Sequence, residues 1–153
     1  MQALAEFAAS LGDETQVIHT SGVSPSDTAT ENIIRINAVG TVNMVEAFYP
    51  VLAEGGVMIN FSSVAAYAMS KKFVIYFTQK NVARFAEKHC RILSISPGCY
   101  LTPMHQKLID NQPETAENQL ELIHAGRWGH PYEMGALTVF LCSSGAGYIN
   151  GVD

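Results

Sequence analysis

Short apolar strands alternate with long helical segments along this chain, and this alternation constrains the fold more than any other feature. The helical pattern covers residues 30–53 and 67–88. Three strand-like runs flank these helices, and each ends in a turn cluster: residues 16–20 before Ser21-Gly22, residues 57–61 before Ser62-Ser63, and residues 91–96 before Pro97-Gly98. This order predicts an α/β fold, a doubly wound parallel sheet with helices on both faces.

The remaining segments fit the same single domain, which would cover residues 1–153. One helix is expected at residues 1–11, and another at residues 131–142, because proline suits the first turn of a helix. Residues 99–129 are mixed and polar, which predicts short helices in a substrate flap. Residues 148–151 would start a last strand.

The composition argues against several classes of protein. The chain has 153 residues, of which 48% are hydrophobic and 15% charged, as in a soluble globular domain with a real core. The net charge is −5 and there is no basic run, so no nucleic-acid partner is expected. No apolar stretch is long enough to span a membrane, and residues 1–7 lack the basic head and apolar core of a secretory signal.

The cysteines and histidines predict neither disulfides nor a metal site. Cysteine occurs 3 times, without an even disulfide framework or a metal-binding spacing, so we interpret these side chains as reduced thiols of a cytoplasmic protein. His19, His124 and His130 are scattered without the spacing of metal ligands, and no metal is assigned.

The residues that follow the predicted strands carry the chemistry. In a parallel sheet ligands bind beyond the carboxyl ends of the strands, so the three turn clusters should converge on one site. Tyr67 precedes Lys71 by one helical turn, and the charge of the lysine would lower the pKa of the phenol. Such a phenol can exchange a proton with a carbonyl or alcohol oxygen, and the hydroxyl of Ser63 could hold that oxygen.

Taken together, these motifs resemble the short-chain dehydrogenase/reductase family, whose fold is Rossmann-like. The matching segments follow the family's order and cover nearly the whole chain: residues 19–22, Asn37 in its helix, and residues 59–63, 67–71, 97–103, 129–134, 140–143 and 148–151. The resemblance implies NAD or NADP as the cofactor and hydride transfer between nicotinamide and a small-molecule carbonyl or secondary alcohol. The sequence around Ser63 and Tyr67 is similar to that of hydroxysteroid dehydrogenases and carbonyl reductases.

The resemblance also implies a role for each site residue. Tyr67 would be the general acid or base, Ser63 would hold the substrate oxygen, and Lys71 would lower the pKa of Tyr67 and bind the cofactor ribose. Asn37 would anchor a water molecule that relays the proton from Lys71. Besides Lys71, the cofactor would contact Tyr67 itself and the turn residues Ser21, Gly22, Pro97, Gly98 and Thr102. The plainer alternatives are a surface pair for Tyr67 and Lys71, a helix-capping hydroxyl for Ser63, and ordinary turn chemistry for the glycines.

Three departures from the family pattern suggest missing segments. No glycine-rich turn of the kind that cradles a pyrophosphate occurs in the chain, so we interpret the first βα units of the fold as missing from it. Ser63 and Tyr67 are only four residues apart, where the family has a longer interval. The sequence ends at Asp153, before the family's usual final strand would be complete. We hypothesise an incomplete chain that lacks segments before Met1, between Ser63 and Tyr67, and after Asp153.

A second tyrosine–lysine pair, Tyr76 and Lys80, competes for the catalytic role. Tyr76 follows Ser63 by 13 residues, which is closer to the family's interval. A helix from Tyr67 to Lys88 would span about 32 Å and cover the sheet, whereas a helix that starts at Tyr76 has only about three turns. We therefore favour Tyr67 as the acid and interpret Tyr76 as part of a packing or subunit-contact face.

Two other functions stay open at this point. A catalytically inactive, truncated relative could act as a binding or assembly domain, and the missing glycine-rich turn supports that alternative. A serine hydrolase that uses Ser63 with Lys71 would normally carry a Gly-x-Ser-x-Gly elbow, which the chain lacks.

The two long helices also predict self-association. Residues 30–53 and 67–88 carry apolar side chains on more than one face, which exceeds what a single sheet-facing stripe needs. The expected assembly is a homodimer or homotetramer that forms through these helices.

Overall fold

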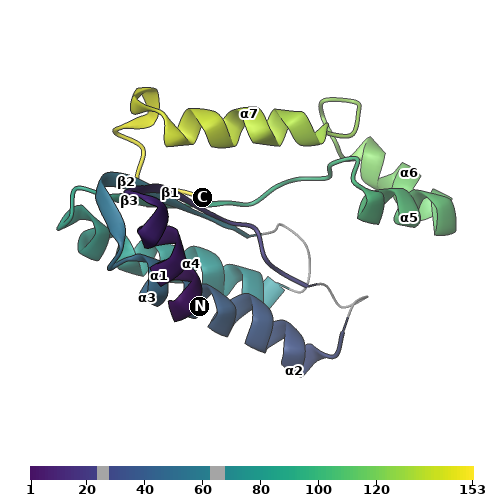
Figure 1. The fold of residues 1–153 in the computed structure, drawn as a ribbon. Coiled ribbons are helices and arrows are strands. Elements are labelled where there is room, and N and C mark those ends of the chain that lie inside the picture. Colours follow the sequence, from purple (N-terminus) through teal and green to yellow (C-terminus); the bar gives the residue numbers. More distant parts are fainter. Residues whose placement is uncertain (24–27, 63–67) are drawn as a thin grey trace.

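Three parallel strands in the order β1-β2-β3 form the central sheet (Figure 1). The computed structural model describes residues 1–23, 28–62 and 68–153. The strands are β1 Glu14–His19, β2 Leu52–Phe61 and β3 Arg91–Ile95. Because both pairs of neighbours are parallel, the three carboxyl ends lie at one edge of the sheet.

Helices cover both faces of this sheet, as a doubly wound fold requires. They are α1 Gln2–Leu11, α2 Thr30–Ile33, the π-helix η1 Ile34–Val39, α3 Gly40–Phe48, α4 Ala68–Ala86, α5 Pro103–Asn111, α6 Pro113–Glu121, α7 Pro131–Cys142 and the 3₁₀ turn η2 Ser144–Ala146. Figure 1 shows α1, α3 and α4 on one face and α7 on the other. The predicted fold class is confirmed. No helix in the described parts of the chain is long and apolar enough to cross a membrane.

Successive side chains of a strand point to opposite faces of the sheet, and this divides the apolar core into two halves. Val57 and Ile59 of β2 lie with Leu93 and Ile95 of β3 against Leu141. The intervening strand residues point to the other face, because side-chain direction alternates along a strand. That second cluster includes Val17, Val45, Phe48, Met58, Phe85 and Ile92. Each face of β2 and β3 therefore buries apolar side chains under its own helices.

The helix predicted at residues 30–53 was wrong at its carboxyl end. The helical segment ends at Phe48, and β2 begins at Leu52. Pro50 explains the difference, because proline lacks an N–H group and its ring obstructs the preceding helical turn. The ammonium of Lys88 then donates to three carbonyl oxygens of this turn, at 2.9, 3.2 and 2.7 Å. These bonds satisfy carbonyls that a helix end leaves without partners.

The strand predicted at the carboxyl end was also wrong, although its position beside the sheet was right. Residues 148–151 form a turn after η2 and no regular strand. The chain nevertheless follows the free edge of β3, because the N–H of Gly151 donates to Ile92 O and the N–H of Ser94 donates to Val152 O, both at 3.0 Å. These two backbone hydrogen bonds join the carboxyl-terminal segment to β3, but they are fewer than the regular series of bonds that would make it a strand.

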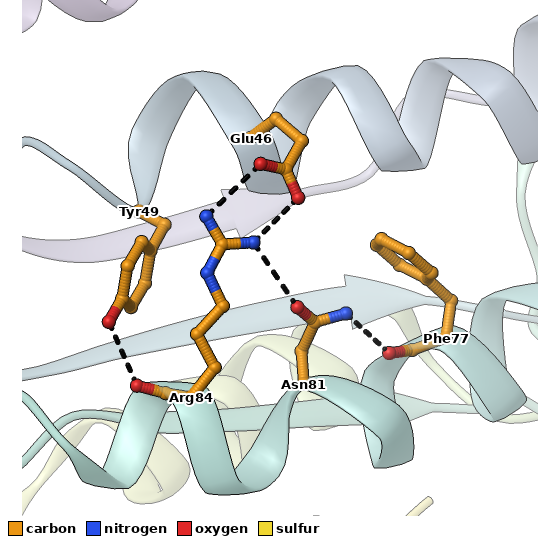
Figure 2. A network of polar contacts seen from close by, with 5 residues as sticks. All are labelled: Glu46, Tyr49, Phe77, Asn81 and Arg84. Carbon is orange, nitrogen blue, oxygen red and sulfur yellow. Dashed lines mark hydrogen bonds and ion pairs between the residues drawn. The ribbon is translucent and has the colours of Figure 1, made fainter.

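A network of polar contacts joins α3 to α4 (Figure 2). The guanidinium of Arg84 donates to both carboxylate oxygens of Glu46, at 2.6 and 3.0 Å. The same guanidinium lies 4.1 Å from the ring centroid of Tyr49, whose hydroxyl donates to Arg84 O at 2.9 Å. A forked ion pair with a stacked ring fixes the spacing of two helices better than a lone ion pair does.

We expect Glu46→Gln to lower the free energy of unfolding by about 0.5 to 1 kcal/mol, because the pair is partly exposed and screened by solvent. The hydrogen bond from Arg84 lowers the pKa of Glu46. The contribution of the pair is therefore present above the ordinary pKa of a glutamate, and it is lost as the pH falls through the lowered folded-state pKa. Urea unfolding at neutral and acidic pH measures both effects.

The matched control is Glu54→Gln, whose carboxylate lies 4.0 Å from His89 with both side chains largely exposed. A loss for Glu54→Gln as large as for Glu46→Gln would contradict a specific role of the α3–α4 network.

Candidate active site

The turn clusters after the strands meet as predicted for a parallel sheet. Ser62 follows β2 directly, and its N–H donates to Ile95 O at the end of β3, at 2.7 Å. Gly22 follows β1, and an added Cβ at Gly22 would lie 2.9 Å from the Nζ atom of Lys71 in α4. One edge of the sheet therefore gathers residues from all three strand ends and from α4.

Lys71 is the buried charge of this edge. Its side chain is 6% exposed, and its ammonium donates to Phe61 O at 3.2 Å. Burial lowers the pKa of Lys71, because an apolar environment disfavours the charged form. Within residues 1–23, 28–62 and 68–153 no carboxylate pairs with it. The ammonium is therefore a buried positive charge that no ion pair compensates in the described structure.

Asn37 holds the turn after β1 against this lysine. Its amide oxygen accepts from the N–H of Val23 and its amide nitrogen donates to Val23 O, both at 2.9 Å. A third bond from the same nitrogen reaches Ser70 Oγ at 3.4 Å. Asn37 lies in the π-helix between α2 and α3 and is 1% exposed. Single π-helical turns inside α-helices are frequent at functional sites.

Ser62 contacts the backbone of Lys71, and the sequence did not reveal this contact. Its hydroxyl donates to the backbone oxygen of Lys71 at 2.7 Å, while the lysine ammonium donates to Phe61 O. Two successive residues at the end of β2 thus bind both ends of the lysine. The serine pair marked the strand end, but only the packing of α4 shows that the hydroxyl of Ser62 reaches the helix.

We expect Ser62→Ala to lower the free energy of unfolding by about 1 kcal/mol, because the buried backbone oxygen of Lys71 would lose the bond from the serine hydroxyl and keep only the one within α4. The control is Ser143→Ala, which removes a bond of the same 2.7 Å length from an exposed position. The control should change stability by less than about 0.5 kcal/mol. Thermal or urea unfolding distinguishes them, and equal losses for both variants would contradict a buried clamp at Lys71.

A buried polar chain, also missed from the sequence, connects β1 to α4. His19 Nδ1 lies 3.3 Å from Asn60 Oδ1, and Asn60 Nδ2 donates to Thr78 Oγ1 at 3.1 Å. Burial, opposed by the Asn60 bond and reinforced by the charge of Lys71, lowers the pKa of His19. The surroundings therefore favour the neutral form of this imidazole next to the site.

The other predicted cofactor-binding residues line a cavity of ≈ 480 Å³ beyond β3. Pro97, Gly98 and Thr102 contribute to its wall. Thr102 also caps α5, because its hydroxyl accepts from the N–H of His105 at 3.2 Å. The segment after β3 thus begins the cavity and then starts the first helix of the predicted flap.

The remaining predicted residues either lie outside the described part of the chain or are exposed on its surface. Ser63 and Tyr67 lie outside the described residues, so their predicted roles stay predictions. Ser21 is exposed beside Gly22. The competing Tyr76 is 56% exposed on the outer side of α4, with Lys80 Nζ 5.4 Å from its ring centroid. Among the residues that the structure describes, no group of three or more His, Cys, Asp or Glu side chains could hold a metal ion.

Comparisons with known proteins agree with this arrangement. A family model described as Enoyl-(Acyl carrier protein) reductase matches residues 3–153. The 3-oxoacyl-[acyl-carrier-protein] reductase FabG of Thermotoga maritima is 31% identical over 130 residues, which cover 78% of this chain and 52% of that protein. The RhlG/NADP active-site complex of Pseudomonas aeruginosa is similar in structure, with a TM-score of 0.84, 23% identity and coverage of 99% of this chain and 67% of that chain.

A 3-oxoacyl-[acyl-carrier protein] reductase with bound NAD from Brucella melitensis is similar too, with a TM-score of 0.81, 23% identity and coverage of 98% of this chain and 63% of that chain. The sheet, its helices and its strand-end site define a Rossmann-like α/β protein. The chain belongs to the short-chain dehydrogenase/reductase family. It spans about half the length of the curated relative FabG.

Proposed function

We propose that this chain carries the proton-transfer site of an NAD(P)-dependent oxidoreductase, which moves hydride between nicotinamide and a carbonyl or secondary alcohol carbon. The observation that carries this proposal is the buried ammonium of Lys71, set between Gly22 and Phe61 at the carboxyl ends of the strands. A buried charge without a carboxylate partner costs stability, so its retention favours a chemical role.

The roles of the site residues follow from this position. Tyr67 would give a proton to the carbonyl oxygen in reduction and take one from the hydroxyl in oxidation. Lys71 would favour the phenolate form of Tyr67, and Ser63 would hold the substrate oxygen. Asn37 would keep the turn that follows β1 against Lys71 and anchor the water that relays the proton.

The residues present fit the nicotinamide end of the cofactor. The absence of a Cβ at Gly22 leaves the backbone open beside Lys71, where a ribose hydroxyl would bind. Ser21 would contact the cofactor on the same side, while Pro97, Gly98 and Thr102 would lie along it at the cavity. Bound NAD or NADP supplies or accepts the hydride, and the protein supplies the position and the proton.

The test is a titration of the whole natural polypeptide that contains this chain with NADH and NADPH, followed by nicotinamide fluorescence, and then turnover of the ketone β-tetralone, followed by nicotinamide absorbance. We expect saturable binding of one cofactor and formation of the secondary alcohol in equal amount to the cofactor oxidised. Absence of binding for both cofactors would contradict the proposal and would favour the inactive binding domain.

We also propose a homodimer or homotetramer through the helix that contains α3 and through α4. Ile34, Ile36 and Val39 are 48%, 40% and 48% exposed on the first of these helical segments, and Tyr76 is exposed on the second. Apolar side chains on two neighbouring helices suit a subunit contact. Light scattering at micromolar concentration measures the assembly, and a monomeric mass would contradict it.

All three cysteines are free, which fits the proposed cytoplasmic location.

A further inference from the structure

A buried row of polar side chains crosses the sheet on the face that α4 covers. The row before it on this face is apolar and in register across the three strands: Val17, Met58 and Ile92. Two residues further along each strand, the same face carries His19, Asn60 and Ser94. All three are at most 5% exposed. Burial of polar groups costs free energy, so a polar row at this depth indicates a role that apolar packing would not fill.

Asn60 joins this polar row to α4. Its amide nitrogen donates to Thr78 Oγ1 at 3.1 Å, and Thr78 lies two helical turns after Lys71 on the same face of α4. Ser62, two residues after Asn60 on β2 and its extension, donates to Lys71 O at 2.7 Å. The end of β2 is therefore bonded to α4 at two points, which fixes Lys71 relative to this strand.

His19 extends the connection to β1. Its ring nitrogen Nδ1 lies 3.3 Å from Asn60 Oδ1. An amide oxygen only accepts, so the neutral ring carries its proton on Nδ1. Three residues later comes Gly22, where an added Cβ would lie 2.9 Å from Lys71 Nζ. In the described sheet β1 pairs with β2 alone, so the bond from His19 helps to fix the end of β1, and with it Gly22, relative to the ammonium.

The ring of His19 suits this place only while it is uncharged. Its bonding partner Asn60 and the neighbouring Thr78 and Ser94 do not titrate, and Lys71 is the charged group among the described residues whose field reaches the ring. Burial, opposed by the Asn60 bond and reinforced by the charge of Lys71, keeps the pKa of His19 below its ordinary value of 6.5. A proton on the ring would place a second positive charge near a buried ammonium that no described carboxylate pairs.

We propose that His19 is a positioning residue of the Lys71 site: its uncharged ring, bonded to Asn60, fixes the end of β1 against α4, and the site works only while that ring is uncharged. The inference rests on the proposed oxidoreductase function for its effect on turnover, but the link between His19 and Lys71 follows from the contacts alone. A merely structural residue would affect stability, whereas His19 would also set an acid limit to activity.

The first test follows the imidazole of His19 by NMR in the whole natural polypeptide that contains this chain, with His19→Asn to assign its signal. We expect a titration midpoint below 6.5, and an upward shift of that midpoint in Lys71→Met, because a positive charge is removed. Lys80→Met removes an exposed charge of the same helix and should leave the midpoint where it was. A midpoint at or above 6.5, or the same midpoint with and without Lys71, overturns the proposal.

The second test separates the hydrogen bond from the charge, by turnover of β-tetralone across a range of pH. His19→Leu fills the space without a donor, and the resulting displacement of the strand end should lower kcat by about 10- to 100-fold at neutral pH. His19→Asn keeps a donor near the position of Nδ1, so its kcat at neutral pH should stay within about 3-fold of the unchanged protein. Because asparagine does not take up a proton, this variant should stay active to lower pH than the unchanged protein.

Ser94→Ala is the matched control, because Ser94 belongs to the same buried row but its hydroxyl has no hydrogen-bond partner among the described residues. It should change kcat by less than about 2-fold. The proposal is overturned if His19→Leu keeps full kcat, if Ser94→Ala loses as much as His19→Leu, or if His19→Asn loses activity at the same acid pH as the unchanged protein. The expected NMR midpoints without any turnover would refute the oxidoreductase and leave the link between His19 and Lys71 standing.

Discussion

Replacement of Lys71 by methionine is expected to remove most catalytic activity while the fold stays as stable as before or becomes more stable. In the proposed mechanism the ammonium favours the phenolate form of Tyr67, and loss of such acid–base support costs about 10²- to 10⁴-fold in rate. Methionine fills a similar volume without a buried charge, and it replaces an ammonium whose one hydrogen bond to the described residues is to Phe61 O. Turnover and urea unfolding of the same sample measure the two effects together.

The pH dependence of stability gives an independent check on Lys71. Burial lowers its pKa in the folded state, so the unfolded chain binds more protons between the folded-state and ordinary pKa values. The cost of the buried charge is therefore fully present below the lowered pKa, and stability rises as the pH increases through it toward the ordinary lysine value. Lys71→Met should abolish this alkaline rise.

The control for this experiment is Lys80→Met, because Lys80 is an exposed residue of the same helix above the ring of Tyr76. It should change activity less than 2-fold and stability by less than about 0.5 kcal/mol. A marked loss of stability in Lys71→Met would show that the lysine is structural, and unchanged activity would exclude it from the reaction.

Tyr67→Phe is expected to lower the turnover number by about 10²- to 10⁴-fold, because it removes the proton that a general acid must supply. The binding of the reduced cofactor should change little, since the phenyl ring keeps the shape of the side chain. Cofactor titration and turnover of β-tetralone measure these quantities separately. The basis of this prediction is the spacing of one helical turn between Tyr67 and Lys71 in the sequence.

The matched variant Tyr76→Phe decides between the two tyrosine–lysine pairs. Tyr76 is more than half exposed on the outer side of α4, so its hydroxyl should contribute nothing to proton transfer. A large loss for Tyr76→Phe together with an active Tyr67→Phe would reverse the assignment.

Most of the regular structure was predictable because its signals are local. The apolar runs at β1, β2 and β3 and the turn residues after them predicted the strands and their carboxyl ends within a few residues. The long helix α4 and the proline start of α7 were likewise predicted. Three predictions were wrong: Pro50 ends the earlier helix at Phe48, β2 begins at Leu52 and not at residue 57, and residues 148–151 lie beside β3 without forming a strand.

The candidate site was predictable only in its residue types. The motif around Asn37 predicted a helix asparagine, but the π-helical turn that holds its amide against Val23 has no periodic signal. The hydroxyl of Ser62 and the ring of His105 were not singled out, because their partners lie on other elements.

The sequence by itself determined the alternation of strands and helices, the turn residues at each strand end and the spacing of Tyr67 to Lys71. These features depend on neighbours within one helical turn or one strand, so local physics is enough to predict them. Only the tertiary structure decided that Lys71 is buried beside Gly22 and Asn37, and that α5 and α7 line an open, mostly apolar cavity with His105 in its wall. Burial and hydrogen-bond partners depend on which distant segments pack together, and short sequence patterns do not encode that choice.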